Sequence, residues 1–367
     1  MYKILFHLNC LEQGGAERVV SNLANQFSKE GYDIVVATEW QGENEFALEE
    51  KVQRIHVGLR EQDEKKNKIS KVLLRLKYLR DCIKKENPDI VIAFAHKANY
   101  RALMATVGMK VPVMISIRTD PVGHYDSFFD KIRIPLLFPR AAGCVFQTEG
   151  QREFFPEYLQ KKSRIILNPV NDKYLNVPAP ETREKVVVQS GRLVDFKNQP
   201  MLLKAFLKVH EKHPDYQLKI YGGDSFDGTK EILESIIEKN HAGDYIHLMG
   251  ASDELEQVLP KAEVYAFSSD WEGLPNALLE AMVLGMPIVA TDCPCGGPRT
   301  VMTHEEDGLL IPIKDPQAME DGINRLIEDR GLAERLGQNA RKLSEKVNSY
   351  SVYTQWRSYI EEIVGEK

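Results

Sequence analysis

The sequence predicts an α/β protein of two domains, each built on a parallel sheet flanked by helices. Apolar runs of strand length alternate with amphipathic helical segments, a pattern typical of βαβ units. The 367 residues are too many for one hydrophobic core and suit two domains. A polar, Pro-containing stretch near the middle separates the two alternating regions. We therefore expect a first domain over residues 1–170, a linker over 171–184 and a second domain over 185–349.

Composition and charge exclude several classes of protein. Hydrophobic residues are 43% and charged residues 28%, as in globular proteins. The net charge of −6 argues against nucleic-acid binding, which favours a basic surface. Five scattered cysteines indicate free thiols in a reducing compartment. The first apolar run, 4–8, is too short for a signal peptide, and no run reaches the ~18 residues of a membrane span. We expect a cytoplasmic protein.

Apolar spacing places the elements of the first half. The expected strands are residues 4–8, 33–38, 52–57, 89–94, 113–117, 144–147 and 164–167. The expected helices are 16–29, 68–85, 98–109 and 128–139, with a loop over 9–15 before the first of them. In a parallel sheet of this kind, ligand loops follow the carboxyl ends of the strands.

The second half repeats the alternation. The expected strands are residues 186–189, 217–221, 245–249, 262–267, 287–291 and 308–311, and the later helices are 315–330 and 332–346. Residues 350–363 form a last helix with Tyr353, Trp356 and Tyr359 on one face. Aromatic residues at this spacing indicate packing and not a cofactor site.

Two carboxylates bracket a strand-to-helix junction in the second half. Glu272 follows the buried strand 262–267, and Glu280 lies one to two turns inside the helix expected from Pro275, a residue suited to the first helical position. A single Glu at a helix end is usually a solvated acid. Here the acid stands between Trp271 and Gly273 at the end of a buried strand, where packing gives no reason for it. We interpret both carboxylates as acceptors of hydrogen bonds from a polar ligand such as a sugar.

Backbone groups of the same junction suit a ligand as well. The N–H groups of Gly273 and Leu274 precede a helix N-terminus, which attracts anions. Gly14 and Gly15 occupy the equivalent junction in the first half, where glycine lets the backbone approach a ligand closely. A plain βα turn would also explain that glycine pair.

A third junction of this type carries two cations. Arg192 and Lys197 flank a strand-to-helix loop, where they can neutralise a diphosphate that leaves during a reaction. Ordinary surface basic residues are the alternative interpretation.

Polar side chains also follow two expected strands of the first half. His96 comes after strand 89–94, and Arg118 and Asp120 come after strand 113–117. A lone histidine is more often structural than functional, so His96 is the weaker candidate.

The carboxylate spacing Glu272-x7-Glu280 resembles the signature of retaining glycosyltransferases of family 4, which have the two-domain GT-B fold. The match includes Glu272-Gly273-Leu274-Pro275, Leu279-Glu280-Ala281-Met282 and Gly285-Met286-Pro287-Ile288-Val289-Ala290. The resemblance implies two Rossmann-like domains that face a central cleft. It also implies that a C-terminal helix, residues 350–367, crosses back to the first domain. The first domain would bind the acceptor and the second the nucleotide sugar.

The resemblance assigns roles in donor binding. Glu272 would hold donor-sugar hydroxyls and Glu280 the ribose diol, while Arg192 and Lys197 would stabilise the leaving diphosphate. The remaining expected donor contacts are Gly14, Gly15, Gly222, Met249, Gly273, Leu274 and Pro275.

The expected acceptor contacts lie in the first half. They are Glu17, His96, Arg118 and Asp120, of which Arg118 and Asp120 are also candidates for catalysis. Many relatives carry His at the position that aligns with Arg118, so this chain departs from a His-based acceptor site.

The resemblance implies transfer of a hexose or N-acetylhexosamine with retention of configuration, from a UDP-linked donor and without a metal or other cofactor. No Asp-x-Asp occurs to hold a divalent ion on a diphosphate. Retention suggests front-face attack with the leaving phosphate as base.

The chain looks most like bacterial transferases that extend lipid-linked oligosaccharides, including N-acetylgalactosamine transferases. Gly14-Gly15-Ala16-Glu17, Arg118-x-Asp120-Pro121 and Gly297-Pro298-Arg299 carry this similarity. The acceptor would then be a polyprenyl-diphosphate-linked glycan at the cytoplasmic face of the membrane.

Two segments combine basic and apolar residues and are candidates for peripheral contact with an anionic membrane. Residues 65–85 hold seven Lys and two Arg against one Asp, with apolar residues at helical spacing. A solvated basic helix face is the alternative. Residues 128–140 are the second segment, with core packing as the alternative.

Two other functions remain open at the level of sequence. A UDP-sugar 2-epimerase shares the GT-B architecture and would turn over without an acceptor. A two-lobed sugar-binding protein without catalytic activity would normally be exported.

Overall fold

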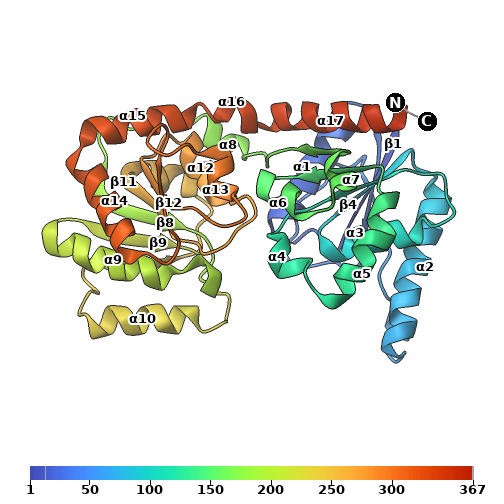
Figure 1. Ribbon diagram of the computed structural model, residues 1–367, viewed down its shortest axis with the longest axis horizontal. Coiled ribbons are helices and arrows are strands. Elements are labelled where there is room, and N and C mark those ends of the chain that lie inside the picture. Colours follow the sequence, from blue (N-terminus) through green and yellow to red (C-terminus); the bar gives the residue numbers. More distant parts are fainter. Residues whose placement is uncertain (13, 366–367) are drawn as a thin grey trace. The chain divides into compact units, whose positions relative to one another are not determined.

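The computed structural model describes residues 1–12 and 14–365, so position 13 of the expected 9–15 loop and residues 366–367 of the expected last helix lie outside the described residues. The chain forms two compact units. Unit 1 contains Met1–Asn168 and Ser349–Lys367, and unit 2 contains Pro169–Asn348. Each unit has its own sheet with helices on both faces (Figure 1). No helix of the described chain is long and apolar enough to cross a membrane.

The sheet of unit 1 is parallel throughout, in the order β3-β2-β1-β4-β5-β6-β7. Its strands are β1 (Lys3–Leu8), β2 (Asp33–Thr38), β3 (Gln53–His56), β4 (Ile90–Phe94), β5 (Val113–Ser116), β6 (Gly143–Phe146) and β7 (Ser163–Ile165). Because every strand runs the same way, all carboxyl ends share one edge of the sheet. The central strands are buried on both faces, which explains why they appear in the sequence as continuous apolar runs.

Alternate strand residues of unit 1 enter two separate cores. Ile4 and Phe6 of β1 pack on the face covered by α1 (Gly15–Lys29) and α17 (Ser349–Gly365). Leu5 packs on the opposite face, which is covered by α2 (Lys68–Glu86), α3 (His96–Ala105) and α5 (Phe128–Leu137). Trp356 of α17 is fully buried in the first core, so the C-terminal helix belongs to unit 1 and its aromatic face packs as predicted.

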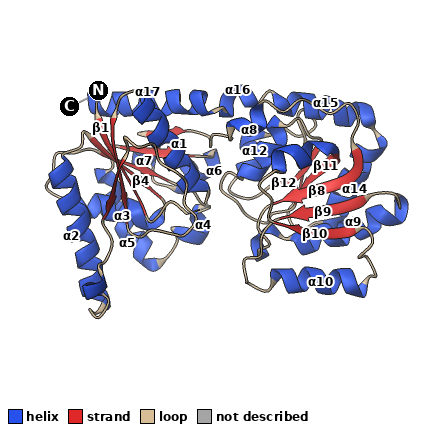
Figure 2. Cartoon of the chain, turned by 180° about the vertical axis from the view of Figure 1, so that it is seen from behind, coloured by secondary structure: helices blue, strands red, loops and turns tan. Residues whose placement is uncertain are grey.

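The sheet of unit 2 has the order β10-β9-β8-β11-β12-β13 and is also parallel. The strands are β8 (Glu184–Ser190), β9 (Gln217–Tyr221), β10 (Ile246–Gly250), β11 (Ala262–Phe267), β12 (Ile288–Thr291) and β13 (Leu309–Ile311). The principal helices are α9 (Gln199–Lys212), α10 (Thr229–Lys239), α12 (Asn276–Val283), α14 (Pro316–Glu328) and α15 (Arg330–Arg341). They enclose the strands from both sides (Figure 2).

Several boundaries differ from the sequence-based expectation. The helix expected over 98–109 is α3, which begins at His96 directly after β4. The helix expected over 332–346 ends at Arg341 and is followed by the short α16 (Ser344–Val347). Pro275 is the residue before α12 and not its first residue, because its ψ of 115° is extended. Proline suits both positions, since neither needs its missing N–H.

Candidate active site

Two loops at the carboxyl edge of unit 2 are fastened together. One follows β8 and the other follows β11, and these strands are neighbours in the sheet. The backbone N–H of Asp270 donates to the carbonyl of Phe196 at 2.8 Å, and Asn198 Nδ2 donates to Asp270 Oδ1 at 2.8 Å. The rings of Phe196 and Trp271 stack with centroids 4.3 Å apart. These contacts place the cationic loop and the carboxylate loop side by side.

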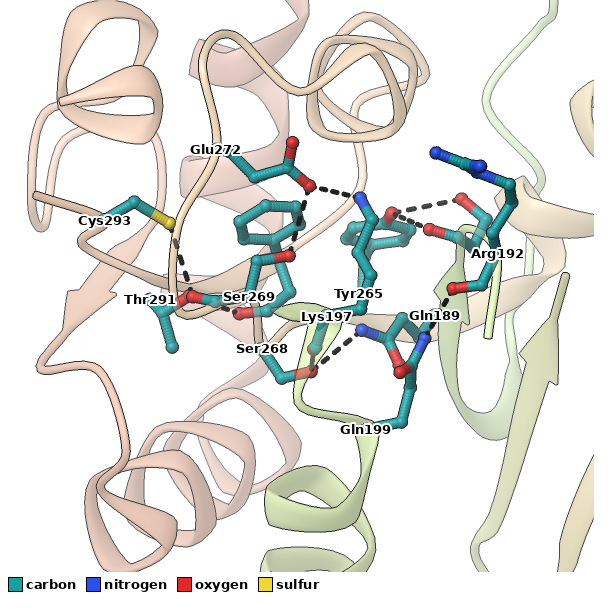
Figure 3. A network of polar contacts seen from close by, with 12 residues as sticks. Gln189, Arg192, Lys197, Gln199, Tyr265, Ser268, Ser269, Glu272, Thr291 and Cys293 are labelled. Atoms are coloured by element: carbon teal, nitrogen blue, oxygen red, sulfur yellow. Dashed lines mark hydrogen bonds and ion pairs between the residues drawn. The ribbon is translucent and has the colours of Figure 1, made fainter. Parts of the chain in front are cut away.

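The two fastened loops bring Lys197 and Glu272 into an ion pair. Lys197 Nζ contacts Glu272 Oε1, and only 13% and 15% of the two side chains are exposed. Ser269 Oγ lies 3.4 Å from the same carboxylate oxygen (Figure 3). A cation and a carboxylate held together at the end of a parallel sheet can engage a phosphate and a sugar hydroxyl at adjacent points.

Buried hydroxyls and amides hold this pair in place. Ser268 Oγ donates to the carbonyl of Lys197 at 2.7 Å and accepts from Gln189 Nε2 at 2.9 Å. Thr291 Oγ1 and Cys293 Sγ donate to the carbonyl of Ser269 at 2.6 and 3.3 Å (Figure 3). None of these supporting residues was selected from the sequence. The only signal for them was polar residues directly after apolar strands.

Arg192 and Glu280, both predicted donor contacts, lie in different surroundings. Arg192 is exposed, and the described residues offer it no ion pair, although its carbonyl accepts from Gln199 Nε2 at 2.9 Å. Glu280 is buried within α12. The structure therefore brings Lys197 to Glu272, while Arg192 keeps its charge directed to solvent.

Two glycines of unit 2 allow close approach of backbone segments. A Cβ atom on Gly222 would lie 1.9 Å from the carbonyl oxygen of Gly191, and one on Gly297 would lie 2.0 Å from that of Gly273. The segment that contains this carbonyl is itself buried, at Gly273, Leu274 and Pro275. Met249, at the end of β10, remains about half exposed.

At the carboxyl edge of unit 1, Gly14 precedes α1 and Gly15 opens it. Glu17 lies in the first turn, where a negative charge is favourable. Burial raises the pKa of the Glu17 carboxyl, and its own backbone hydrogen bond opposes that effect. The predicted glycine loop and Glu17 thus share one helix N-terminus.

Arg118 is enclosed by aromatic rings. Its guanidinium carbon lies 4.8 Å from the ring centroid of Phe94 and 5.5 Å from that of Trp356, and Nη1 donates to Asn168 Oδ1 at 3.0 Å. Within the described chain no carboxylate pairs with it, and its Nε and Nη2 are buried without a partner. Burial lowers the pKa of Arg118 to about 9, which leaves it charged at neutral pH. Arg118 thus connects β4, through Phe94, with α17, through Trp356. Its hydrogen bond adds Asn168, where the first segment of unit 1 ends.

Asp120 and His96 are each held by local contacts. Asp120 caps the short helix α4 (Pro121–His124) by accepting from the N–H of Val122 at 3.0 Å. His96 Nε2 lies 3.1 Å from Oδ1 of Asp130, a buried residue of α5 that was not selected from the sequence. Strand order puts His96, Asp120 and the glycine loop after the adjacent strands β4, β5 and β1.

Comparison with family models decides the class of protein. Residues 13–174 match the model of "Glycosyltransferase Family 4", and residues 170–343 match that of "Glycosyl transferases group 1". This chain is a glycosyltransferase with one domain of each kind. The two matches meet where unit 1 passes into unit 2, and the second contains both Lys197 and Glu272.

Several curated glycosyltransferases match this chain over nearly their whole length. An N-acetylgalactosamine-N,N'-diacetylbacillosaminyl-diphospho-undecaprenol 4-alpha-N-acetylgalactosaminyltransferase of Campylobacter jejuni is 26% identical over 98% of this chain and 100% of its own. A second C. jejuni enzyme, an alpha-1,4-N-acetyl-D-galactosaminyltransferase acting on a GalNAc-containing diphospho-undecaprenol, is 23% identical over 99% of both chains. An uncharacterised glycosyltransferase of Haemophilus influenzae is 24% identical over 97% and 98%.

Solved structures confirm the predicted fold. HepE of Anabaena, crystallised with UDP and glucose, superposes with a TM-score of 0.84 at 18% identity over 99% of this chain and 100% of its own. TarM of Staphylococcus aureus gives a TM-score of 0.78 at 16% identity over 98% and 99%. At these identities the similarity speaks for the GT-B fold alone.

Proposed function

We propose that this glycosyltransferase moves a hexose or N-acetylhexosamine from a UDP-linked donor to a sugar acceptor, with retention of configuration and without a metal. The observation that carries the proposal is the Lys197–Glu272 pair at the carboxyl edge of unit 2. A leaving diphosphate needs positive charge, which Lys197 and the exposed Arg192 can supply. The absence of an Asp-x-Asp motif supports charge stabilisation by side chains.

The donor residues would act in sequence along the bound nucleotide sugar. Glu272 would accept hydrogen bonds from sugar hydroxyls while Lys197 turns to the diphosphate, and Glu280 would hold the ribose. Gly14 and Gly15 at the N-terminus of α1 would add backbone N–H groups to the phosphates. The leaving phosphate would take the acceptor proton, so no second carboxylate nucleophile is required.

The acceptor would be a polyprenyl-diphosphate-linked glycan bound by unit 1. Two C. jejuni relatives with full-length matches carry diphospho-undecaprenol substrates in their names. Asp120 and His96 stand at the edge where acceptor loops are expected, and Glu17 lies at the adjacent helix N-terminus. The N–H groups of Arg118 are enclosed by neighbouring residues and cannot reach a ligand directly. We therefore keep Arg118 in the acceptor site only as a residue that holds its neighbours in place.

Donor binding and transfer test the proposal together. We would measure thermal shifts with UDP, GDP, ADP and NAD, with and without Mg²⁺. We would then assay UDP-linked glucose, galactose, N-acetylglucosamine and N-acetylgalactosamine against polyprenyl-diphosphate-linked N-acetylgalactosamine. A metal-independent shift with UDP and an α-linked product are expected. UDP-sugar turnover without an acceptor would instead indicate a 2-epimerase, and sugar binding without turnover would indicate a binding protein.

Contact with an anionic membrane is part of the proposal, and α5 is the surface that supports it. Phe128, Phe129, Ile132 and Leu136, here called the α5 ridge, lie on the outward face of the helix, and Phe128 is 72% exposed. The structure thus excludes core packing for these four residues, although Phe138 beyond them is fully buried. Lys131 and Arg133 flank the ridge, and Asp130 turns inward. An apolar ridge between cations suits the headgroup region of an anionic bilayer.

Vesicle sedimentation distinguishes α5 from the other basic–apolar helix. Vesicles of phosphatidylglycerol should bind the protein, and vesicles of phosphatidylcholine should bind it less. Phe128→Ser with Phe129→Ser should lower binding at least about tenfold, since both rings leave the membrane. The matched control is Ile69→Ser with Leu73→Ser on α2, where both side chains are equally exposed. Loss of binding in the control alone would move the contact to α2.

A further inference from the structure

A polar cluster at the carboxyl end of β4 is built around a buried carboxylate. Asp130 Oδ1 accepts from Tyr100 Oη at 2.9 Å and contacts His96 Nε2 at 3.1 Å. Its other oxygen accepts from Ser127 Oγ. Only 3% of the Asp130 side chain is exposed, against 26% of His96. One inward carboxylate therefore collects three donors, of which Tyr100 is buried, His96 is partly exposed and Ser127 is exposed.

The carboxylate of Asp130 is ionised. Burial alone would raise its pKa, but the hydrogen bonds from Ser127, Tyr100 and His96 outweigh burial and hold the pKa below its ordinary value. An ionised carboxylate only accepts hydrogen bonds. Nε2 of His96 must therefore carry the proton of the contact with Asp130.

The position of this proton determines whether Nδ1, the other ring nitrogen of His96, is a hydrogen-bond donor or an acceptor. When the imidazole is neutral and Nε2 is protonated, Nδ1 has a lone pair and no proton. No hydrogen bond to Nδ1 is found from the described residues. Tyr100 and Tyr125 contact the ring edge-on, with centroids 5.1 and 4.5 Å away, and so restrict its rotation. The ring is thus held with one nitrogen inward as donor and the other available as acceptor.

The backbone places His96 at the sheet edge under strain. Ala95, between β4 and His96, has φ of 75° and ψ of 163°, a conformation that is nearly restricted to glycine. This turn lets α3 begin at His96, without a linking residue beyond Ala95. The loop after β4 lies between the loops after β1 and β5 in strand order, so His96 stands between Gly14–Gly15 and Asp120.

We propose that His96 Nδ1 accepts a hydrogen bond from a hydroxyl of the acceptor sugar, and that Asp130 is the positioning residue that fixes the imidazole in the required tautomer. The inference rests on the proposed function and adds the chemistry of the acceptor contact. A neutral imidazole in this tautomer has no outward N–H to give to a phosphate oxygen. The position therefore selects a hydroxyl, and the acceptor diphosphate must be bound elsewhere.

Nitrogen NMR of the whole protein tests the tautomer without any ligand. In a sample labelled at histidine nitrogens, His96 is assigned as the resonance missing from His96→Gln. At a pH of about 8.5, where an ordinary imidazole is neutral, we expect the Nε2-protonated form, with an Nε2 proton that Asp130→Asn shifts. A wild-type spectrum with the proton on Nδ1 would overturn the proposal.

Kinetics separates positioning from a structural role. With polyprenyl-diphosphate-linked N-acetylgalactosamine, His96→Gln and Asp130→Asn should raise the acceptor KM about five- to tenfold, as expected for one lost hydrogen bond. The donor KM and the thermal shift with UDP should stay unchanged. The matched control is Tyr158→Phe, which removes a hydrogen bond to Ile134 of the same helix α5 and should leave the acceptor KM as it is.

The possible failures are distinguishable. A wild-type protein that transfers no sugar from any UDP donor contradicts the proposed function. Transfer whose acceptor KM is insensitive to His96→Gln contradicts only the role of His96. A rise in the acceptor KM that Tyr158→Phe reproduces would show that the effect is structural.

Discussion

The two units carry the same kind of sheet edge, but they treat positive charge differently. In unit 2, Lys197 is paired with Glu272, and Arg192 lies in solvent without an ion pair among the described residues. In unit 1, Arg118 is enclosed by Phe94 and Trp356, and its hydrogen bond goes to Asn168. Both edges therefore have an arginine directly after a buried strand, in opposite environments.

The difference shows how charge is kept available for a ligand. A cation paired with a carboxylate at a partly open site can exchange that partner for a phosphate when a ligand arrives. A cation held by aromatic faces and one amide oxygen gains its stabilisation from packing, and it would lose those contacts by moving to a ligand. We therefore assign the exchangeable charge to unit 2 and a structural charge to unit 1.

The largest expected effect is on transfer and belongs to unit 2. Lys197→Ala should lower kcat about a hundredfold, or about 2.7 kcal/mol of barrier, because the leaving diphosphate loses a preorganised cation. Steady-state transfer assays measure the effect. The matched control is Lys208→Ala on α9, which breaks only a surface pair with Glu211. Near-wild-type turnover of Lys197→Ala would end the assignment of this site.

The next prediction compares alanine substitutions of the two arginines, one of which should affect stability and the other sugar transfer. Arg118→Ala should destabilise the protein by about 2 kcal/mol, because it removes ring contacts and a buried hydrogen bond. Arg192→Ala should leave the unfolding free energy unchanged and reduce transfer. Denaturant unfolding and transfer assays measure both variants. The comparison between the units would be wrong if Arg118→Ala were stable and inactive.

A pH effect is expected in unit 1 from His7. Its Nδ1 donates to the carbonyl of Ala37 at 3.0 Å, its Nε2 is buried without a partner, and burial lowers the pKa of His7 to about 4. The unfolded state takes up a proton below about pH 6.5 while the folded state does not, so stability is lost as pH falls below that value.

The predicted loss is about 1.6 kcal/mol between pH 6.5 and pH 5.0, and urea unfolding of wild type against His7→Gln at both pH values isolates it. The folded pKa values of Glu17 and Glu39 are raised, chiefly by burial, so these two groups change the unfolding free energy with pH in the opposite direction. Subtracting the pH dependence of His7→Gln from that of wild type removes their contribution. Equal pH dependence in the two proteins would exclude His7 as the cause.

The smallest expected effect concerns the backbone that carries His96. Ala95→Gly should raise the unfolding free energy by about 1 kcal/mol, because glycine adopts the observed φ of 75° without strain. The gain is the relieved strain less the greater flexibility of glycine in the unfolded chain. Thermal unfolding measures it, and Ala98→Gly inside α3 is the control that should destabilise. A loss of stability in Ala95→Gly would show that the turn is unstrained.

Much of the fold was predictable because parallel strands buried on both faces leave continuous apolar runs. Strands 33–38 and 217–221 were predicted with the bounds that the structure has. The first residue of α3 was missed because the φ of Ala95 depends on tertiary contacts and leaves no local signal. The split of the 332–346 segment was missed because its apolar spacing continues across the break.

The candidate site was predictable where chemistry follows directly after a strand. Glu272 and Lys197 were both selected in this way, but their pairing depends on two loops 75 residues apart in the chain. Asp130 was not predictable, since it sits inside a helix whose exposed residues dominate the pattern. Its partners Tyr100 and His96 are 30 and 34 residues away.

The placement of the three tryptophans gives the protein built-in optical reporters. Trp271 is 40% exposed beside Glu272, whereas Trp356 is fully buried against Arg118. An indole in contact with water emits at longer wavelengths than one in an apolar core. If the third tryptophan, Trp40, is replaced by Phe, the longer-wavelength emission comes from Trp271 and reports on changes at the two fastened loops of unit 2. The blue part then follows the opening of the core beneath α17.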